Sequence, residues 1–338
     1  MGLFDIYYPA AQDLLDKMTL EEKVGQMFLA RYPEKRVNEE IESHHPGGYI
    51  IFRNNLEGQT PHTMKLRLKN NQEASKVPLF LATDEEGGEV CRFSAVFRRE
   101  RFRAPQEVAK DGLNKLILDT MDKIEFLQDF GVNVNLAPVC DMSDDPESFI
   151  YKRSMGMDPE GTGNAVASMV KCYNAQSIVS CLKHFPGHGN NEDTHKGEAI
   201  DSRTYQDLED RDFIPFRKGI KADAPMVMVG HQILNSIHMG VPASCSRKVI
   251  GILRNEIEFS GVVITDDLAM GAIKKYKTPE EVAIEAVKAG NDMLISSDFR
   301  NQAGAVLNEV KAGEIQEEVV NIAVRRILAC KMRYGIIK

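Results

Sequence analysis

A short polar segment after residue 183 carries the residue types that proton transfer requires. Asp193 and His195 are separated by Thr194 alone, so an extended chain would place both side chains on one side of the backbone. Histidine titrates near neutral pH and can donate and then accept a proton, and a neighbouring carboxylate raises its pKa and orients its ring. The spacing therefore predicts an acid/base pair. The competing interpretation is a surface ion pair without a catalytic role.

Further ionisable residues follow short apolar runs of the chain. They are Asp84-Glu85-Glu86-Gly87-Gly88, Asp141, Lys183-His184, His231 and Asp266-Asp267. Carboxylates, a lysine and histidines together offer many hydrogen bonds to a polyhydroxylated ligand, so we expect a sugar substrate. For any single carboxylate the alternative is a structural ion pair that holds a loop.

The apolar runs themselves number eight, and most are followed by a helical pattern. They are Met27–Ala30, Tyr49–Phe52, Leu79–Thr83, Val132–Ala137, Ser180–His184, Met226–Gly230, Val262–Thr265 and Met293–Ser296. Runs that do not alternate are typical of parallel strands covered by helices on both sides. Eight such units predict an α/β fold, a closed (β/α)8 TIM barrel forming one domain over residues 1–338, whereas an open doubly wound sheet would give similar local patterns.

The barrel explains why the ionisable residues matter, because reactive groups of this fold lie at the C-terminal ends of its strands. Several intervening segments carry helix signals. Thr278-Pro279-Glu280-Glu281 and Thr19–Glu22 are capping sequences, and the segment Leu113 to Phe130 has helical spacing and ends at Gly131. One pocket at one end of the barrel could therefore hold all of the ionisable side chains.

Composition and charge exclude several classes of protein. The chain has 338 residues, of which 43% are hydrophobic and 27% charged, so it can form a large core. The net charge of −8 opposes binding to nucleic acid or to an anionic membrane surface. The basic run from Arg98 to Arg103 is short and is interpreted as a solvated loop.

Cysteine usage and the apolar segments bear on location. The six cysteines include no CxxC pair, so we expect reduced, buried thiols and neither disulfides nor zinc ligands. The sequence as given has no signal peptide and no stretch that could span a bilayer, so a cytoplasmic location is expected. Oligomeric state is not indicated by the sequence.

The segment KHFPGHG at 183–189, followed by the Asp-x-His pair, resembles the signature of glycoside hydrolase family 3, of the bacterial β-N-acetylglucosaminidase type. Further segments recur in that family in the same order. They are MTLEEKVGQMF, GGYIIF, DEEGGEVCRF, NVNLAPVCDM, RSMGMDPEG, VMVGH, PASCS, GVVITDDLAM and AGNDMLI. The resemblance covers nearly the whole chain.

The resemblance implies a role for each matching residue. Asp266 matches the nucleophile, His195 the general acid/base and Asp193 the residue that orients it. The positions that match residues holding the sugar are Asp84, Arg92, Arg153, Lys183 and His184. The implied activity is retaining hydrolysis of terminal β-linked N-acetyl-D-hexosamine from cell-wall or chitin-type saccharides, with no cofactor. This assignment is chemically reasonable, because glycoside cleavage needs a proton donor and a carboxylate on opposite faces of the sugar.

The chain departs from the family pattern at three places. Only Asn190, Asn191 and Glu192 stand between KHFPGHG and Asp193, one residue fewer than usual, which makes Glu192 an alternative proton donor. Glu89 replaces a common arginine, and Asn133 replaces a frequent acidic residue. We therefore expect the substrate subsite to differ from that of the family.

Other functions are compatible with parts of the pattern. A β-glucosidase or a glycoside phosphorylase could use the same scaffold, although many family β-glucosidases carry the acid/base in a second, C-terminal domain that we do not expect here. A catalytically silent sugar-binding barrel is a further alternative. The residue types of His184, His188, His195 and Asp193 suit zinc, but Pro186 prevents the helix that would align them, so no metal is expected. His231 is expected in the barrel floor.

Overall fold

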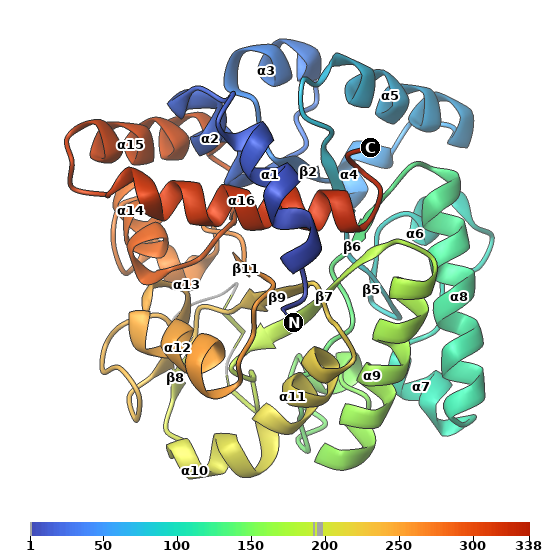
Figure 1. The fold of residues 1–338 in the computed structure, drawn as a ribbon. Coiled ribbons are helices and arrows are strands. Elements are labelled where there is room, and N and C mark those ends of the chain that lie inside the picture. Colours follow the sequence, from blue (N-terminus) through green and yellow to red (C-terminus); the bar gives the residue numbers. More distant parts are fainter. Residues whose placement is uncertain (1, 192, 195–198) are drawn as a thin grey trace.

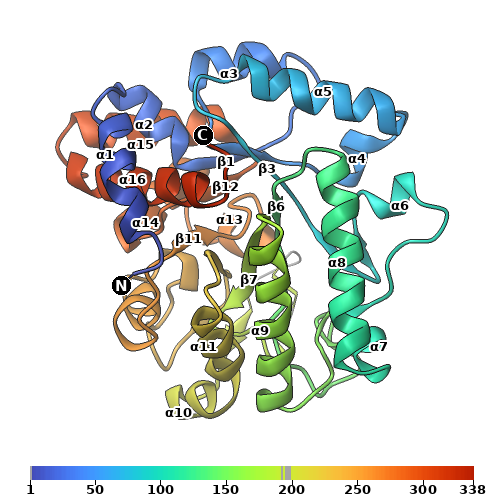
Figure 2. The ribbon, with the colours of Figure 1, turned by 45° about the vertical axis from the view of Figure 1, so that its right-hand side comes forward.

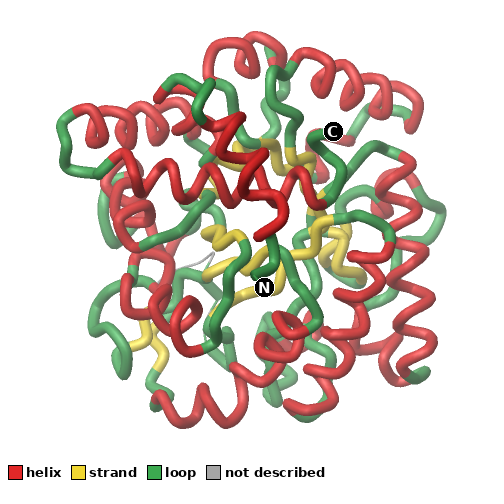
Figure 3. Tube along the Cα trace, viewed as in Figure 1, coloured by secondary structure: helices red, strands yellow, loops and turns green. Residues whose placement is uncertain are grey.

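The computed structural model describes residues 2–191, 193–194 and 199–338. Eight parallel strands follow the order β11-β9-β7-β6-β3-β2-β1-β12, and a parallel bridge between Ile264 and Met293 joins β12 back to β11. The strands are β1 Phe28–Arg31, β2 Gly48–Ile50, β3 Phe80–Thr83, β6 Val134–Asn135, β7 Val179–Phe185, β9 Met226–Val229, β11 Val262–Thr265 and β12 Leu294–Ser296. The sheet is thus a (β/α)8 barrel, and its strands lie inside a ring of helices (Figures 1 and 3).

Helices of very different length surround the barrel (Figures 1 and 2). The α-helices are α1 Tyr8–Leu15, α2 Leu20–Gln26, α3 Val37–His44, α4 Arg53–Leu56, α5 Pro61–Ala74, α6 Ser94–Phe97, α7 Pro105–Lys110, α8 Leu113–Asp129, α9 Pro159–Ala175, α10 Tyr205–Asp207, α11 Phe213–Lys221, α12 Arg247–Gly251, α13 Gly271–Lys274, α14 Pro279–Ala289, α15 Phe299–Lys311 and α16 Glu317–Arg333. Short 3-10 turns cover Asp5–Tyr7, Tyr151–Arg153 and Ala243–Cys245, and π-turns cover Leu208–Asp212 and Ile252–Glu256. Two further sheets of two short strands each lie in the loops that follow barrel strands. They are β4 Glu85–Gly87 with β5 Val90–Cys91, and β8 Ile200–Asp201 with β10 Ile233–Leu234.

The eight strands predicted from apolar runs are all present. Each barrel strand overlaps one predicted run. Apart from exposed Arg31 at the end of β1, the strand residues are buried, because helices cover one face and barrel side chains the other. The helix signals are confirmed as well. The Thr19 and Thr278 side chains each accept a hydrogen bond from the third helical residue, and α14 ends at Gly290 with a positive φ of 106°.

The core is one large apolar cluster inside and around the barrel, with a second cluster where β7, β9 and α11 meet. All six cysteines are free thiols, as predicted, and Cys172 alone among them is partly exposed. Within the described ranges, no helix is long and apolar enough to cross a membrane.

The terminal helix α16 crosses the barrel and packs beside α1 (Figures 1 and 2). Its Lys331 is completely buried, which is unusual for lysine. The Lys331 Nζ donates a hydrogen bond to Oε1 of Gln26 at 2.8 Å and lies 5.0 Å from the centre of the Phe80 ring. Burial lowers the pKa of Lys331 to about 7.

Candidate active site

A cavity of about 420 Å³ opens among the C-terminal ends of the barrel strands. It brings together seven of the eight residues predicted for the site, namely Asp84, Arg92, Arg153, Lys183, His184, Asp193 and Asp266. The eighth, His195, lies outside the described residues. All eight barrel strands, or the loops that follow them, contribute residues to the lining of this cavity, as expected for the active end of a barrel.

Lys183 belongs to the polar wall of the cavity and lies near the C-terminal end of strand β7. Its buried Nζ contacts Oδ1 of Asp84 at 2.8 Å and Oε1 of Glu86 at 2.5 Å. Burial alone would lower the pKa of Lys183, but the two carboxylates outweigh it and raise this pKa above its usual value. The amine is therefore a fixed cation at the cavity wall.

Arg153 extends the same network from the Tyr151–Arg153 turn. Its guanidinium binds Glu86 through two parallel hydrogen bonds, Nε to Oε2 at 2.9 Å and Nη2 to Oε1 at 2.8 Å. Burial tends to raise the pKa of Glu86, but the charges of Arg153 and Lys183 lower it well below its usual range. Arg92 Nη2 contacts the other oxygen of Asp84 at 3.5 Å. One connected set of charges thus positions four residues that can hold a sugar.

His184 is fixed by a carboxylate behind it. Asp141 Oδ2 lies 2.6 Å from Nδ1 of His184 and also accepts its backbone N–H, while Oδ1 accepts the N–H of His188 at 2.6 Å. Burial would raise the pKa of Asp141, but the charge and hydrogen bonds of His184 and His188 lower it to about 2. Because Asp141 is ionised, Nδ1 of His184 carries the proton, and Nε2 lies on the cavity side, 3.4 Å from Arg153 Nη2.

Asp266 follows β11 directly on the opposite wall. Its backbone N–H donates to Val229 O at 2.9 Å, and its Oδ1 accepts the N–H of Asp267 at 2.8 Å. The buried His231 lies within hydrogen-bonding distance of the Asp267 carbonyl, with Nε2 at 3.0 Å, and of Ser244 Oγ, with Nδ1 at 2.8 Å. His231 is buried, as the sequence predicted, and it helps to fix the strand end that carries Asp266.

The loop that bears Asp193 begins from a rigid stem. Gly187 has a φ of 114°, a conformation that favours glycine, and a Cβ there would meet the side chain of Asp212 at 2.5 Å. The Gly187 carbonyl accepts a hydrogen bond from Arg203 Nη2 at 2.7 Å. Farther along, the carbonyl of Thr194 accepts the N–H of Ala272 at 3.0 Å. Asp193 lies between these two anchored points and lines the cavity.

His188, one of the residues whose type suits zinc, lies in a buried position beside an aromatic ring. Its ring is buried and packs edge-on against Phe149, with ring centres 4.6 Å apart. Neither ring nitrogen has a hydrogen-bond partner in the described part of the chain, and burial lowers the pKa of His188 to about 4. Across the described residues, no three His, Cys, Asp or Glu side chains converge as metal ligands.

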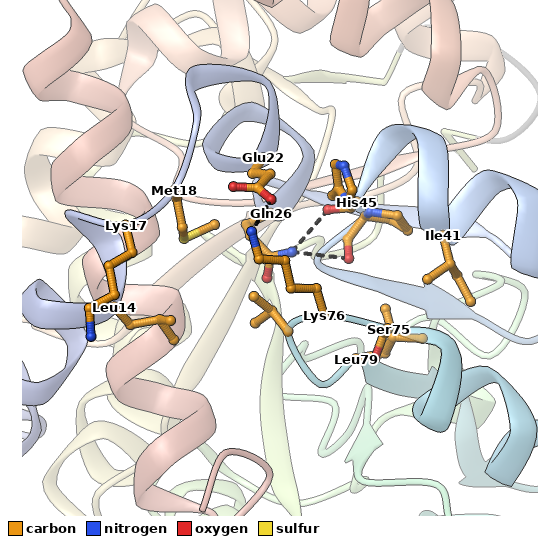
Figure 4. Close-up of a pocket in the computed structure, with 12 residues that line it drawn as sticks. Leu14, Lys17, Met18, Glu22, Gln26, Ile41, His45, Ser75, Lys76 and Leu79 are labelled. Atoms are coloured by element: carbon orange, nitrogen blue, oxygen red, sulfur yellow. Dashed lines mark hydrogen bonds and ion pairs between the residues drawn. The ribbon is translucent and has the colours of Figure 1, made fainter.

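The other end of the barrel holds a different kind of pocket, shown in Figure 4. Gln26, which precedes β1, occupies its centre and donates through Nε2 to the carbonyls of His45 and Pro46, just before β2. The pocket measures about 220 Å³, and side chains such as Met18, Ile41 and Leu79 make its wall mostly apolar. It lacks the cluster of carboxylates and cations found at the strand C-termini, so we do not assign the reaction to it.

Comparison with known proteins agrees with this geometry. Residues 19–330 match the family described as "Glycosyl hydrolase family 3 N terminal domain". The chain belongs to glycosyl hydrolase family 3. A curated relative from Nitrosomonas eutropha, named beta-hexosaminidase, is 31% identical over 280 residues, which is 80% of each chain. This family 3 chain is accordingly a glycoside hydrolase.

Solved structures extend the comparison. A family 3 beta-N-acetylglucosaminidase from Paenibacillus sp. superposes with a TM-score of 0.88 at 30% identity, covering 94% of this chain and 63% of that one. The beta-glucoside phosphorylase BglX superposes with a TM-score of 0.87 at 21% identity, covering 97% of this chain and 60% of that one, and at this identity it supports the fold alone. The family 3 chain thus spans less than two thirds of either structure.

The departures from the family pattern fall in different places. Glu89 lines the cavity, is exposed, and pairs with Lys152 Nζ at 3.3 Å, so its effect on the subsite stays a prediction. Asn133 does not line the cavity. Its amide binds the backbone of Leu79 and Leu81 at the start of β3, so the expectation that it alters the subsite is wrong. Glu192, the alternative proton donor, lies outside the described residues.

Two residues that hold the site together follow apolar runs in the sequence, but the sequence analysis assigned neither of them a role. Glu86 and Asp141 are buried and do not line the cavity, yet Glu86 binds Arg153 and Lys183, and Asp141 binds His184. Strand alternation was an available signal for Glu86, because residues 84 and 86 point to one side of an extended segment and Glu85 to the other. Glu85 indeed turns away and accepts the backbone N–H groups of residues 92–94.

Proposed function

We propose that this chain is a retaining exo-glycosidase that removes terminal β-linked N-acetyl-D-hexosamine, N-acetylglucosamine above all, from cell-wall or chitin-type saccharides. The observation that carries the proposal is that Asp266 and Asp193 line the same cavity as the connected residues Asp84, Arg153 and Lys183. Cleavage of a bound sugar requires a carboxylate at the anomeric carbon, a proton donor for the leaving oxygen and side chains that hold the sugar.

We call the five residues that can hold the non-reducing sugar the clamp. They are Asp84, Arg92, Arg153, Lys183 and His184. Asp84 and Nε2 of His184 can accept hydrogen bonds from hydroxyl groups, while Arg92, Arg153 and Lys183 can donate to them. Because these side chains are already oriented by Glu86 and Asp141, little reorganisation is needed when the sugar binds. The clamp therefore fixes the anomeric carbon relative to Asp266.

Asp266 then acts as nucleophile. Its carboxylate attacks the anomeric carbon as the glycosidic C–O bond breaks, and His195, oriented by Asp193, gives its proton to the leaving oxygen. Water next attacks the glycosyl–Asp266 ester. The same histidine takes a proton from that water, which restores the enzyme and releases the sugar with its original β configuration.

Hydrolysis is favoured over phosphorolysis by the pairing of the cavity cations. Arg153 and Lys183 are each bound to Glu86, and Arg92 to Asp84, so two carboxylates already neutralise most of the charge of these three cations before any phosphate arrives. A phosphorylase needs cationic groups that remain available to an attacking phosphate. The observed pairing leaves these residues better suited to a neutral sugar.

A substrate panel tests the proposal. The wild type, Asp266→Asn and His195→Ala are assayed on 4-nitrophenyl N-acetyl-β-glucosaminide, on the matching glucoside and on a β-1,4-linked N-acetylglucosamine disaccharide, with and without phosphate. We expect the wild type to cleave the N-acetylglucosaminides without needing phosphate. Asp266→Asn should lose all but a trace of activity.

The His195→Ala variant tests the acid/base assignment. It should lose about 10²- to 10⁴-fold in kcat/KM on the disaccharide, a poor leaving group, and much less on the nitrophenyl substrate, which needs little protonation. Full activity of His195→Ala on the disaccharide would show that another group, such as Glu192, is the donor. No turnover of any glycoside by the wild type would leave only a sugar-binding role.

A further inference from the structure

A second cavity opens beside the catalytic one at the same end of the barrel. It measures about 440 Å³ and lies among the residues that follow β1, β2 and β12. Its exposed polar lining includes Arg31, Asn54, Ser297 and Asn301. Pockets of this size commonly hold small ligands, so the cavity is large enough for a sugar ring.

The two cavities share a wall. Arg31, the last residue of β1, lines both of them and lies over the ring of Phe52, 4.9 Å from its centre. Ser297 lines the second cavity, and its Oγ donates to Oδ2 of Asp267 at 2.7 Å. Asp267 lines the catalytic cavity and directly follows Asp266. The second cavity therefore begins next to the residue proposed to attack the anomeric carbon.

The arrangement around the barrel gives the direction in which a leaving group extends. The clamp residues come from β3, from β7 and from the loop after β6, which are neighbours in the barrel. Asp266 follows β11, on the far side, and the next strands around the ring are β12, β1 and β2. A sugar held by the clamp with its anomeric carbon at Asp266 directs its leaving group away from the clamp, toward the second cavity.

The lining of the second cavity suits an uncharged, hydroxyl-rich group. Asn54 and Asn301 supply amides that both donate and accept, and Ser297 supplies a hydroxyl. Arg300 Nε binds buried Glu40 at 3.1 Å, and Asn301 Nδ2 binds Asp298 at 3.0 Å. Exposed Arg31 and Glu34 add one charge of each sign to the lining. The walls are thus held in place by these contacts, and charges of opposite sign are interspersed with neutral hydrogen-bonding groups.

We infer that this second cavity is a leaving-group subsite, which binds the pyranose ring released when the glycosidic bond breaks. The inference rests on the proposed glycosidase function. It assigns Asn54 and Asn301 to the recognition of a saccharide leaving group and distinguishes them from the clamp, which recognises the sugar that is transferred. A substrate with a sugar leaving group gains contacts here that an aryl glycoside cannot make.

The test compares two substrates on the same proteins. The double variant Asn54→Ala/Asn301→Ala is assayed on the β-1,4-linked N-acetylglucosamine disaccharide and on 4-nitrophenyl N-acetyl-β-glucosaminide. With two neutral hydrogen bonds lost, kcat/KM for the disaccharide should fall about tenfold relative to kcat/KM for the aryl glycoside. Asn308→Ala, an exposed position on the same helix α15, is the matched control and should not change that ratio.

Each outcome decides a separate point. A ratio that is unchanged in the double variant and in both single variants would overturn the subsite, while aryl glycoside turnover by the wild type would leave the glycosidase proposal intact. If the wild type cleaves neither substrate, the proposed function fails, and the subsite fails with it. The single variants keep the test valid should the double variant not fold.

Discussion

Asp141 holds the Nδ1 side of the His184 ring at 2.6 Å from a fully buried position behind the cavity wall, so the other ring nitrogen is the one presented to substrate. Asp141→Asn removes the negative charge that selects this tautomer. Hydrogen bonds to charged groups contribute about 1.5–3 kcal/mol, so we expect kcat/KM to fall roughly ten- to a hundredfold. Steady-state kinetics on the aryl glycoside measures this, with exposed Asp145→Asn from the same loop as control. Equal kinetics for the two variants would contradict the role of Asp141.

Asp141 also makes stability depend on pH. Its pKa of about 2 in the folded protein lies below the ordinary value of about 3.9, so its contribution to the free energy of unfolding is complete above pH 4. The contribution is lost as the pH falls from about 4 to about 2. We therefore expect the stability gap between wild type and Asp141→Asn, measured by urea unfolding, to narrow over this range. A gap that stays constant down to pH 2 would mean that Asp141 is not held ionised by its neighbours.

Glu86 joins two clamp cations, so its charge should matter for substrate binding. In Glu86→Gln the side chain keeps its size but leaves Arg153 and Lys183 without their shared carboxylate. We expect kcat/KM to fall about a hundredfold, because a buried charged pair broken on one side costs several kcal/mol and the clamp loses its geometry. Circular dichroism should show a folded protein. Glu100→Gln, on an exposed loop, is the control. If Glu86→Gln had the same kcat/KM as this control, the clamp would not depend on Glu86.

Lys331 should reduce the stability of the fold near neutral pH. Its pKa of about 7 in the folded chain is below the ordinary value for lysine. Between about pH 7 and pH 10 the unfolded chain therefore binds a proton that the folded chain has lost. The free-energy cost of burying this side chain diminishes as the pH rises through that range. One pKa unit corresponds to about 1.4 kcal/mol. Allowing for the lost Gln26 hydrogen bond, we expect Lys331→Met to raise the free energy of unfolding at pH 6 by roughly 2 kcal/mol.

The comparison of Lys331→Met with wild type is made by urea unfolding at pH 6 and at pH 9. The advantage of the methionine variant should shrink at the higher pH, because the wild-type amine is then neutral in the folded protein. Lys248→Met, at an exposed site on α12, should show no such change. A Lys331→Met protein that is less stable than wild type at both pH values would show that the buried amine contributes favourable contacts that outweigh its burial.

The barrel could be predicted from the sequence because its strands are continuous apolar runs. Each run can be identified from its own residues, without knowing which strand it pairs with. Val262–Thr265 is an example, because its four residues form an uninterrupted β-branched run, and all four are buried. Asp266 is the first acidic residue after that strand, and the resemblance to the family predicted its role as nucleophile. Local sequence therefore defined the scaffold and one chemical group at its end.

The supporting residues needed information that a single sequence does not contain. Asp141 and His184 are separated by 42 residues and meet because β6 and β7 pair in one particular register, shown by Val134 opposite Val179. Lys183 likewise meets Asp84 only through the closed barrel. The second cavity is more remote still, because Asn54 and Asn301 come from opposite ends of the chain and lie together only where the barrel closes.

The central claim is that Asp266 forms a covalent bond to the transferred sugar. It is tested most directly by treating the wild type with a 5-fluoro N-acetyl-β-glucosaminide bearing a dinitrophenyl leaving group, whose fluorine slows release of the glycosyl–enzyme more than its formation. Mass spectrometry of the proteolysed protein should then find one added glycosyl group, on the peptide that contains Asp266. A label on another carboxylate, or release of the sugar in the inverted configuration with no label at all, would contradict the account.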